Sequence, residues 1–477
     1  MTDKYSGINS KAGIDWTSVF IFIALMFIGW INIFATTCDL PFTSFEFGSK
    51  YCMQLLWMGL SLFVGMLILL SSDKYYYIYS YPAYVGALLL LILTLFVGRT
   101  VNGSRSWLSF GPVAIQTAEL MKLAACLAVA RYMSEYNFSL KRPRNVMVLC
   151  GLLLLPIMII LLQNDTGSAI VYCSFMFMLY REGVNGWIYI LGFSIIGLFV
   201  LSFLLQPAVL LISLLVLYTI ACGLIYGRWR QCAIYLAGTM FVTGILFFGS
   251  LLIFGTGLSF YHSLIGGSLL SLIVVGIYAY REKLQGLFLA MIAFVGSIIY
   301  MHLIEYVFNN ILQTHQQKRI LDLLGLESDL KGWGYNVHQS KIAIGSGGFT
   351  GKGFLQGTQT NYGFVPEQST DFIFCTVGEE FGLWGTWLVV GLFGWLIIRL
   401  INMGERQQET FNRIYCYCAA GIILFHVVIN IGMTLGLLPV IGIPLPLFSY
   451  GGSSLLVFTV MFFIAVKLDA SGRIKSF

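Results

Sequence analysis

Long apolar runs separated by short polar turns follow one another along almost the whole chain. A helix of about 20 apolar residues crosses a hydrocarbon core of about 30 Å, and in lipid it satisfies its own backbone hydrogen bonds. The pattern therefore predicts an all-α polytopic membrane protein rather than a β-barrel. We expect about fourteen spans, near residues 20–35, 53–71, 77–97, 113–132, 146–162, 167–180, 186–205, 207–226, 233–254, 263–280, 287–304, 372–399, 415–436 and 446–467.

One polar segment interrupts this pattern in the second half of the chain. It runs from Gly334 to Gly382, contains many glycines, and turns apolar at Asp371-Phe372-Ile373-Phe374. We expect it to belong to a large loop over residues 305–370, followed by three spans that close the bundle. Ionisable groups at membrane depth are usually functional, so we look for chemistry where this loop meets the bilayer.

Composition and charge predict the sidedness of this loop. The residues are 58% hydrophobic and 10% charged, whereas a soluble domain is about 25% charged. Basic residues gather in the turns after even-numbered spans, as cytoplasmic turns require, so both termini are expected inside and the loop outside. The net charge of +6 then requires no nucleic-acid partner. The basic residues of these turns are Lys74, Lys141, Arg142, Arg144, Arg181, Arg228, Arg230, Arg281 and Lys283.

The glycine-rich part of the loop, GSGGFTGKG at residues 345–353, allows two interpretations. Its exposed amides could form an anion-binding nest, or its glycines only permit the tight turns of a packed re-entrant loop. A Walker loop is excluded, because Ser346 replaces its first glycine and Gly353 replaces its Ser/Thr. No strand or soluble nucleotide domain surrounds it either. The sequence therefore predicts no nucleotide cofactor.

Asp371 stands at the junction between the loop and the next apolar span. With Ser369 and Thr370 it could form a capping cluster at a helix N-terminus. Alternatively, it is a functional carboxylate at the outer mouth of the bundle. Glu379 and Glu380 lie about two turns further along the same span and favour a polar cavity there.

Polar residues of other spans point to the same outer cavity. Gln116, Glu119 and Lys122 recur at intervals of three and are expected on one helix face. There they form either a structural ion pair or the lining of a substrate cavity. Gln163, Asn164 and Asp165 form an outward turn between two spans, where a helix N-cap and a part in the cavity are equally open interpretations. Asn430 and then residues 439–454, PVIGIPLPLFSYGGSS, give an outward segment broken by prolines and glycines. At membrane depth only protein or a water cavity can cover such backbone.

These motifs resemble those of the SEDS family (shape, elongation, division and sporulation). GYNVHQSKIAIGSGGFTGKGFLQGTQ, followed by PEQSTDFIF and GEEFG, is similar to the loop signature of the family. NIGMTLGLLPVIGIPLPLFSYGGSS, RSWLSFGPVAIQTAELMK and LQNDTGSA resemble three further signatures. GTQ and PEQ favour the RodA branch, which serves elongation, over the FtsW branch, which serves division. The resemblance covers residues from about 15 to 180 and about 300 to 470.

The resemblance implies a peptidoglycan glycosyltransferase that polymerises lipid II, an undecaprenyl-diphosphate disaccharide-peptide, during cell elongation. It implies a place in the bacterial inner membrane, with the active site facing outward. The implied partners are a class B penicillin-binding protein transpeptidase and other membrane proteins of the elongation complex. The essential acid of the family falls on Asp371. Its substrate-binding cavity residues match Arg105, Trp107, Gln116, Glu119, Lys122, Gln339, Ser340 and Glu367.

The chain departs from the family mainly in length. The family has ten spans, so about four of the fourteen are expected to be inserted, and an even number preserves the sidedness of the loop. We therefore divide the chain into a first half of the core at 1–185, inserted helices at 186–286, and the rest of the core at 287–477. In addition, Ser369 stands where many relatives have histidine, so it is not expected to carry a proton.

The implied reaction needs one base, because the donor sugar already carries a diphosphate that an acceptor 4-hydroxyl displaces. We expect Asp371 to be this base, with its pKa lowered by the adjacent helix N-terminus, or alternatively to help hold a divalent cation, Mg²⁺ or Mn²⁺. Lys122, Arg105 and loop amides are candidates to stabilise the diphosphate charge. The rival classes are a flippase for the lipid-linked precursor and a non-catalytic scaffold. Clustering of the polar groups in the outer half of the membrane favours the enzyme.

Overall fold

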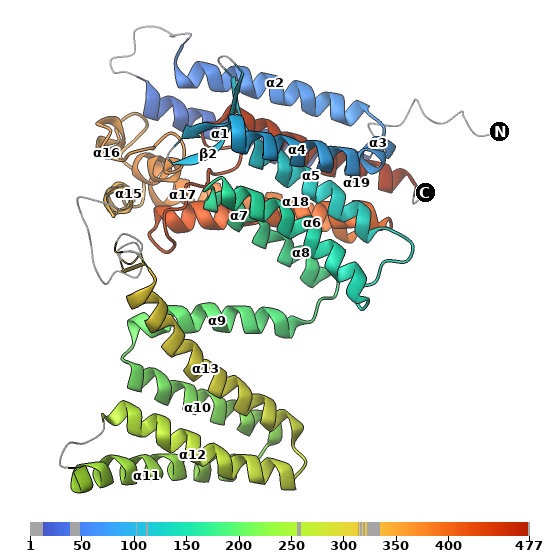
Figure 1. The fold of residues 1–477 in the computed structure, drawn as a ribbon. Helices are drawn as coiled ribbons and strands as arrows, with labels where there is room; N and C mark the ends of the chain where they lie inside the picture. Colours follow the sequence, from blue (N-terminus) through green and yellow to red (C-terminus); the bar gives the residue numbers. More distant parts are fainter. Residues whose placement is uncertain are drawn as a thin grey trace. The chain divides into compact units, whose positions relative to one another are not determined.

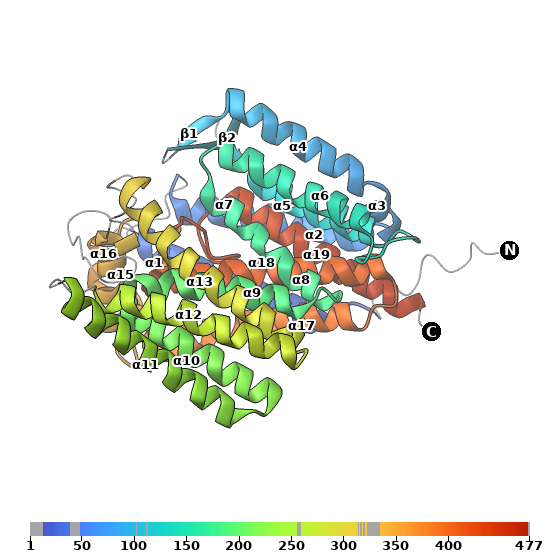
Figure 2. The same cartoon turned by 60° about the horizontal axis from the view of Figure 1, so that its bottom comes forward.

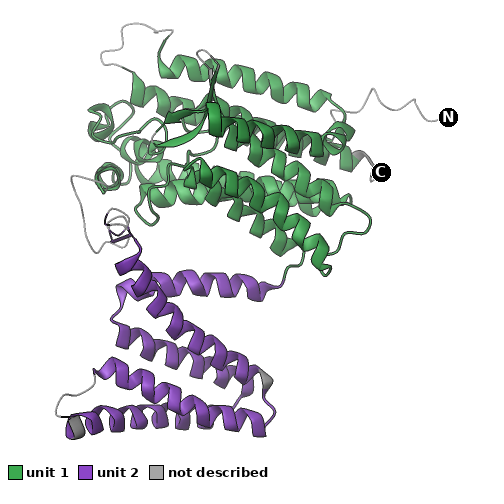
Figure 3. Ribbon diagram, in the orientation of Figure 1, with its two compact units in different colours: residues 1–184, 329–477 green, residues 185–328 purple. Residues whose placement is uncertain are grey.

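The computed structural model describes residues 13–475, except residues 39–47, 102, 111–112, 255–258, 313, 315–316, 318–319 and 322–333. It divides the chain into two compact units. Unit 1 comprises residues 1–184 and 329–477, and unit 2 comprises residues 185–328 (Figures 1 and 3). Most of the polar N-terminal segment and a large part of the expected loop, residues 322–333, lie outside the described residues.

Unit 1 is a helical bundle with one small sheet. Its central helix is α18, which is buried over most of its length and packs against α5, α8, α17 and α19 (Figure 2). Its helices are α1 (Trp16–Thr37), α2 (Lys50–Leu70), α3 (Asp73–Ile78), α4 (Ser80–Val97), α5 (Thr117–Met133), α6 (Pro143–Leu162), α7 (Thr166–Val171), η1 (Tyr172–Ser174), α8 (Phe175–Arg181), α15 (Tyr335–Ser346), α16 (Thr358–Asn361), α17 (Ile373–Glu405), α18 (Thr410–Thr434) and α19 (Gly452–Lys475).

A three-stranded antiparallel sheet joins α4 to α5, which the all-α expectation missed. It consists of β1 (Arg99–Val101), β2 (Ser104–Phe110) and β3 (Val113–Gln116) in that order. In its register, Trp107 on β2 pairs with Gln116 on β3. The first residues of the span expected at 113–132 therefore belong to a strand, and helix α5 begins only at Thr117. The sheet, α15 and α16 lie at the end of unit 1 opposite to the end of α19 (Figures 1 and 2).

Twelve helices among the described residues are long and apolar enough to cross a membrane, against about fourteen expected. Two expected spans account for the difference. The first is α5, which has only 17 residues. The second, expected at 167–180, is divided into α7, η1 and α8. The chain is nevertheless a multi-pass helical membrane protein, as its apolar pattern predicted.

Ion pairs close the end of unit 1 opposite to the sheet. Asp15, the N-cap of α1, accepts hydrogen bonds from Arg399 on α17 at 2.5 and 2.6 Å and from Arg406 at 3.3 Å. Burial alone would raise the pKa of Asp15, but the hydrogen bonds from Arg399, Ser18 and Arg406 outweigh it and lower that pKa. Arg406 and Arg473 also contact Asp469 on α19. The first and last helices of the unit are thus held together by charge.

Over its described residues, unit 2 is a bundle of five helices with its own apolar core. They are α9 (Gly186–Leu204), α10 (Pro207–Tyr226), α11 (Trp229–Phe254), α12 (Phe260–Arg281) and α13 (Gln285–Asn310). Buried leucines of α10 pack there with Leu264 and Leu272 of α12 and with Phe294 and Ile298 of α13. The helix that covers the expected span at 287–304, α13, packs within unit 2. It also extends six residues into the loop expected at 305–370.

Candidate active site

Asp371 lies just before α17, and its main chain is tied down from two directions. Asn430 of α18 donates a hydrogen bond to the Asp371 carbonyl oxygen at 2.8 Å. The Ser449 hydroxyl donates to the Thr370 carbonyl oxygen at 2.6 Å. The Tyr450 amide donates to the Ser369 carbonyl oxygen at 2.9 Å. These bonds attach the residues before α17 to α18 and to the segment before α19. The position of Asp371 is therefore set by tertiary contacts.

The Asp371 carboxylate is partly exposed and is not a helix cap. α17 begins at Ile373, its N-cap residue is Phe372, and no side chain caps it. Burial, followed by the nearby Glu367 carboxylate, raises the pKa of Asp371 to about 6. The expectation that the helix N-terminus lowers this pKa was wrong, because the carboxylate gains no helix amide and loses hydration. Among the described residues, none donates a hydrogen bond to it.

Non-helical backbone lies beside this carboxylate, as the sequence predicted for residues 439–454. Between the end of α18 and the start of α19 the chain forms neither helix nor strand. Gly442 has a positive φ of 75°, and a Cβ placed on it would lie 3.5 Å from Asp371 Oδ2. The carbonyl oxygen of Ile443 accepts a hydrogen bond from Asn430 at 2.8 Å. Asn430 thus satisfies a backbone oxygen in the buried part of this segment, whereas Pro439, Val440 and Gly442 are exposed.

Glu119 and Lys122 form a buried ion pair beneath this segment. Their side chains are 2% and 1% exposed, and Lys122 Nζ lies 2.7 Å from Glu119 Oε1. Lys122 Nζ also lies 3.0 Å from His426 Nε2 on α18, and His426 Nδ1 lies 3.2 Å from the Pro444 carbonyl oxygen. Of the two alternatives, an ion pair or the lining of a substrate cavity, the structure shows the ion pair. It also links that pair through His426 to the segment beside Asp371.

Gln116 does not share the helix face of this pair. It ends β3, and its side-chain amide donates to Asp165 Oδ2 at 2.9 Å and to Ser168 at 3.3 Å. Asp165 is the N-cap of α7, one of the two interpretations of this turn, and accepts from the Ser168 amide at 3.0 Å. The spacing of three residues was misleading here because the chain changes from strand to helix between Gln116 and Thr117. Gln116 thus joins the sheet to α7.

The remaining candidate residues lie on the sheet and on α15. Arg105 and Trp107 are on β2, where the Arg105 side chain is exposed and donates to the Leu95 carbonyl oxygen at 3.2 Å. Ser340 of α15 is fully buried and donates to the Thr434 carbonyl oxygen at 2.9 Å, whereas Gln339 is half-buried. Within the described residues, no hydrogen bond or ion pair joins these four side chains to the Asp371 carboxylate. Of the nine candidates, Glu367 is the one whose charge reaches Asp371.

The glycine-rich loop packs against a break in α17. The amides of Lys352 and Gly353 donate to the carbonyl oxygens of Glu379 and Glu380, each at 3.0 Å. The break lies at Gly382, which has a φ of 63°, and a Cβ on this residue would lie 2.4 Å from the Gly351 nitrogen. These contacts favour the packed re-entrant loop over an anion-binding nest, because the amides are already bonded within the protein.

The two glutamates of α17 are buried at this contact. Glu379 accepts hydrogen bonds from Lys352 Nζ at 2.6 Å and from the amides of Gln359 and Thr360 at 2.8 and 2.9 Å. Glu380 is 1% exposed, and neither of its carboxylate oxygens has a hydrogen-bond partner among the described residues. Glu379 thus holds the loop to α17 and does not line an open cavity.

Sequence reasoning missed His426 and undervalued Asn430, the two residues of α18 that reach this site. Both lie inside an apolar helix, where an uncharged polar side chain has no strong local signal. Their spacing of four residues does place them on one helix face. A search for polar pairs at this spacing within the last spans could therefore have found them.

Comparisons with known proteins agree with this fold. The family model FTSW_RODA_SPOVE, described as "Cell cycle protein", matches residues 15–221 and 269–474. The chain is 29% identical to the peptidoglycan glycosyltransferase RodA of Treponema pallidum over 476 residues, which is 98% of this chain and 99% of that protein. It is 45% identical to the peptidoglycan glycosyltransferase MrdB of Escherichia coli over 166 residues, which is 35% of this chain and 45% of that one.

Two solved structures show the same architecture. One is a chain from a study of how a peptidoglycan synthase complex coordinates polymerization and crosslinking. Its TM-score is 0.59 and its sequence identity 23%, and the match covers 96% of this chain and 98% of that one. The other is the RodA protein of Thermus thermophilus, with a TM-score of 0.55, 22% identity, and coverage of 97% and 98%. With the family model matching most of its length, this RodA-like chain belongs to the FtsW, RodA and SpoVE family of cell cycle proteins, the SEDS family.

Proposed function

We propose that this chain is a peptidoglycan glycosyltransferase that polymerises lipid II, with Asp371 as its general base. Relatives along its whole length carry that enzyme name. The observation that carries the assignment of Asp371 is its partly exposed carboxylate, whose pKa is raised to about 6. It stands in a segment in which the carbonyl oxygens of Ser369, Thr370 and Asp371 each accept one hydrogen bond. A base works best when its pKa lies near the operating pH and its position is fixed.

The proposed reaction is a single displacement at the anomeric carbon of the donor sugar. The 4-hydroxyl oxygen of the acceptor forms the new glycosidic bond, and the bond to undecaprenyl diphosphate breaks. Asp371 accepts the hydroxyl proton as the new bond forms. With a pKa of about 6, roughly nine-tenths of the carboxylate is charged at pH 7 and ready to accept it. The diphosphate is already a good leaving group, so one carboxylate suffices.

Negative charge develops on the leaving diphosphate and needs a positive partner. Arg105 is the better candidate, because its guanidinium is exposed on β2. Lys122 is almost fully buried between Glu119 and His426, so it supports the site from beneath. The amides of Lys352 and Gly353 are bonded to α17. Of the three candidates named from the sequence, Arg105, Lys122 and the loop amides, we therefore assign stabilisation of the diphosphate charge to Arg105.

A divalent cation fits the donor set only in part. Mg²⁺ is usually held by one or two carboxylates together with substrate phosphates. Asp371 and Glu367 are two such carboxylates, whereas no group of three His, Cys, Asp or Glu side chains that could hold a metal occurs among the described residues. Asp371 and Glu367 would hold the ion, which when bound would offset the diphosphate charge. Holding the ion would be an alternative to the base role of Asp371, because a cation on the carboxylate makes it a poorer proton acceptor.

The cellular setting follows from the same proposal. We place the protein in the bacterial inner membrane, with both termini in the cytoplasm and Asp371 facing outward, because basic residues gather in the alternate turns. We assign it to cell elongation with a class B penicillin-binding protein as its partner. A chain of similar fold belongs to a complex that coordinates polymerization and crosslinking, which supports such a partner.

The test is a polymerisation assay with the purified full chain, its co-expressed transpeptidase and labelled lipid II. Asp371→Asn should lower the rate by about 10²–10⁴-fold, the usual contribution of a general base. Asp73→Asn is the matched control, because Asp73 begins α3 at a distance in sequence and structure from the site, and should leave the rate unchanged. Wild-type rates from a folded Asp371→Asn protein would disprove the base role. Transfer of lipid II across vesicles without polymer would instead indicate a flippase.

A further inference from the structure

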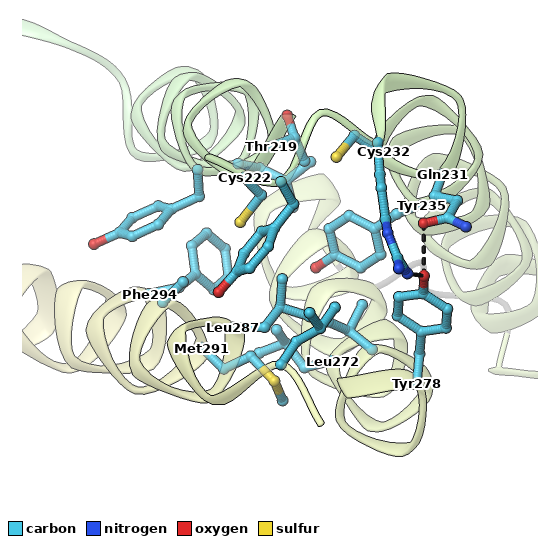
Figure 4. Close-up of a pocket in the computed structure, with 17 residues that line it drawn as sticks. Thr219, Cys222, Gln231, Cys232, Tyr235, Leu272, Tyr278, Leu287, Met291 and Phe294 are labelled. Atoms are coloured by element: carbon cyan, nitrogen blue, oxygen red, sulfur yellow. Dashed lines mark hydrogen bonds between the residues drawn. The ribbon is translucent and has the colours of Figure 1, made fainter. Parts of the chain in front are cut away.

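Unit 2 contains a cavity that takes no part in the proposed reaction. Side chains of α10, α11, α12 and α13 line a cavity of about 110 Å³ (Figure 4). Aromatic and aliphatic side chains line it, including Leu272, Leu287, Met291 and Phe294. A mostly apolar lining favours an apolar occupant over water, because water needs polar partners.

A second hollow continues from this cavity along the outside of α11 and α12. Its volume is about 580 Å³, and it shares Gln231, Tyr235, Val275 and Tyr278 with the first. We call the combined space the α11–α12 groove. Beyond the shared residues, its walls include Gly238, Val242, Leu270 and Val274.

The groove has the length of one membrane leaflet. From Gln231 to Val242, α11 advances by 11 residues, which is about 16 Å at ~1.5 Å per residue. Half of a hydrocarbon core of about 30 Å is about 15 Å. An extended acyl chain of a lipid in one leaflet therefore matches the groove along its whole length.

One end of the groove is polar. The Tyr278 hydroxyl donates to Gln231 Oε1 at 2.7 Å, and Arg228 donates to that hydroxyl and, at 3.0 Å, to Glu282 Oε2 (Figure 4). The two turns at this end carry four basic side chains and one carboxylate, so their net charge is positive. Such basic turns between membrane helices attract anionic lipid headgroups. The side chains are Arg228, Arg230, Arg281 and Lys283, with Glu282 as the carboxylate.

The α11 side of the groove lies outside what the family model describes. Residues 222–268 have no match in that model, and they include the whole of α11. One wall of the groove is therefore built from a segment that the family description does not cover.

We propose that the α11–α12 groove binds one acyl chain of an anionic phospholipid, with the lipid phosphate at the basic turns around Arg228. The apolar walls hold the chain, their length matches one leaflet, and the positive end selects the headgroup. This binding does not require the chemistry of Asp371, so a failure of either proposal leaves the other intact.

The first test uses the unaltered full chain in detergent. Phosphatidylglycerol with a photoreactive diazirine on one acyl chain is compared with phosphatidylcholine carrying the same chain, and labelled peptides are mapped by mass spectrometry. We expect labelling of α11 and α12 by the anionic lipid, and labelling about fivefold weaker by the zwitterionic lipid, which corresponds to about 1 kcal/mol. Equal labelling by both lipids, or labelling confined to other helices, would overturn the proposal.

A pair of glycine variants tests the groove itself. Gly238 lines the groove and Gly244 does not, yet a Cβ on either residue meets nothing within 4 Å. Gly238→Leu should fill the groove and lower labelling by about tenfold, which is about 1.4 kcal/mol. Gly244→Leu on the same helix should label as the wild type does. Arg228→Gln should lower the preference for the anionic lipid, and equal labelling of both glycine variants would disprove the site.

Discussion

The side-chain amide of Asn430 donates two hydrogen bonds of 2.8 Å, one to the Asp371 carbonyl oxygen and one to the Ile443 carbonyl oxygen. An Asn amide has two N–H donors, so both are used. Asn430 is fully buried on α18, the central helix of unit 1. One side chain therefore fixes the spacing between the residue before α17 and the broken segment that carries Gly442. We regard Asn430 as a positioning residue for Asp371.

Replacing Asn430 should lower the turnover number more than it changes substrate binding. Asn430→Leu keeps the approximate volume but leaves two buried carbonyl oxygens without a donor, at a cost of about 1–3 kcal/mol. If the freed backbone moves Asp371 out of line, kcat should fall about tenfold, equivalent to about 1.4 kcal/mol of barrier. The measurement is kcat and KM for lipid II polymerisation by the folded variant.

Asn412→Leu is the matched control for this change. Asn412 is also buried on α18, and its amide donates to Gln407 and to the Leu468 carbonyl oxygen at the far end of the helix. Its loss should destabilise the protein without a specific effect on kcat. Equal losses of kcat in the two variants would show that Asn430 acts only through stability.

The two ring nitrogens of His426 should have separable effects. A carbonyl oxygen only accepts, so Nδ1 carries the hydrogen that is donated to Pro444, and Nε2 accepts from the Lys122 ammonium. His426→Asn keeps a donor near the position of Nδ1, whereas His426→Gln places its amide nearer Nε2. Because Pro444 belongs to the segment beside Asp371, the Asn variant should keep several-fold more polymerase activity than the Gln variant.

His302→Gln provides the control for the histidine series. His302 is an exposed residue of unit 2 whose ring contacts the Tyr261 hydroxyl, so this change should leave polymerisation unaffected. Thermal unfolding of each variant separates loss of activity from loss of fold. Equal activities of His426→Asn and His426→Gln would contradict a special role of the Pro444 contact.

The pH dependence of polymerisation should report the Asp371 carboxylate. Only the charged carboxylate accepts a proton, so kcat should be full above a pKa of about 6 and fall as the pH drops through that value. Glu367 raises this pKa through its like charge. Glu367→Gln should therefore move the midpoint to lower pH, because one cause of the shift is removed while burial remains.

The midpoint is measured from kcat at a series of pH values with the transpeptidase present. Glu135→Gln is a suitable control. Glu135 lies in the turn after α5, is exposed, and accepts a hydrogen bond from the Tyr81 hydroxyl of α4. The control should keep the wild-type midpoint. A midpoint that stays in place in Glu367→Gln would show that another group controls the reaction.

The membrane spans could be predicted closely because each depends on local information. A span needs only enough consecutive apolar residues, and the chain boundaries expected at 186–205 and 207–226 differ from α9 and α10 by at most one residue. The sequence also indicated the chemically important residue types, since a carboxylate beside an apolar helix stands out wherever it lies. The broken segment at 439–454 was visible for the same reason, through its prolines and glycines.

The short sheet and the divided helix escaped prediction because their pairing is not local. β2 and β3 are recognised only by their pairing, in which Trp107 lies opposite Gln116. The apolar stretch at 113–116 is too short for its pattern to distinguish a strand from the start of a helix. Similarly, the expected span at 167–180 is a largely apolar run that divides into α7, η1 and α8. The assignment of α13 to unit 2 depends on packing between helices, which hydropathy does not encode.

The amino-acid sequence by itself determined that this protein is a helical membrane protein of the SEDS family and that Asp371 is its leading candidate base. Only the tertiary structure decided how Asp371 is held and how it titrates. The hydrogen bond from Asn430 spans 59 residues, and the contact between Lys122 and His426 spans 304. A pKa depends on burial and on neighbouring charge. Both are created when distant segments pack together, so the sequence pattern around one residue cannot contain them.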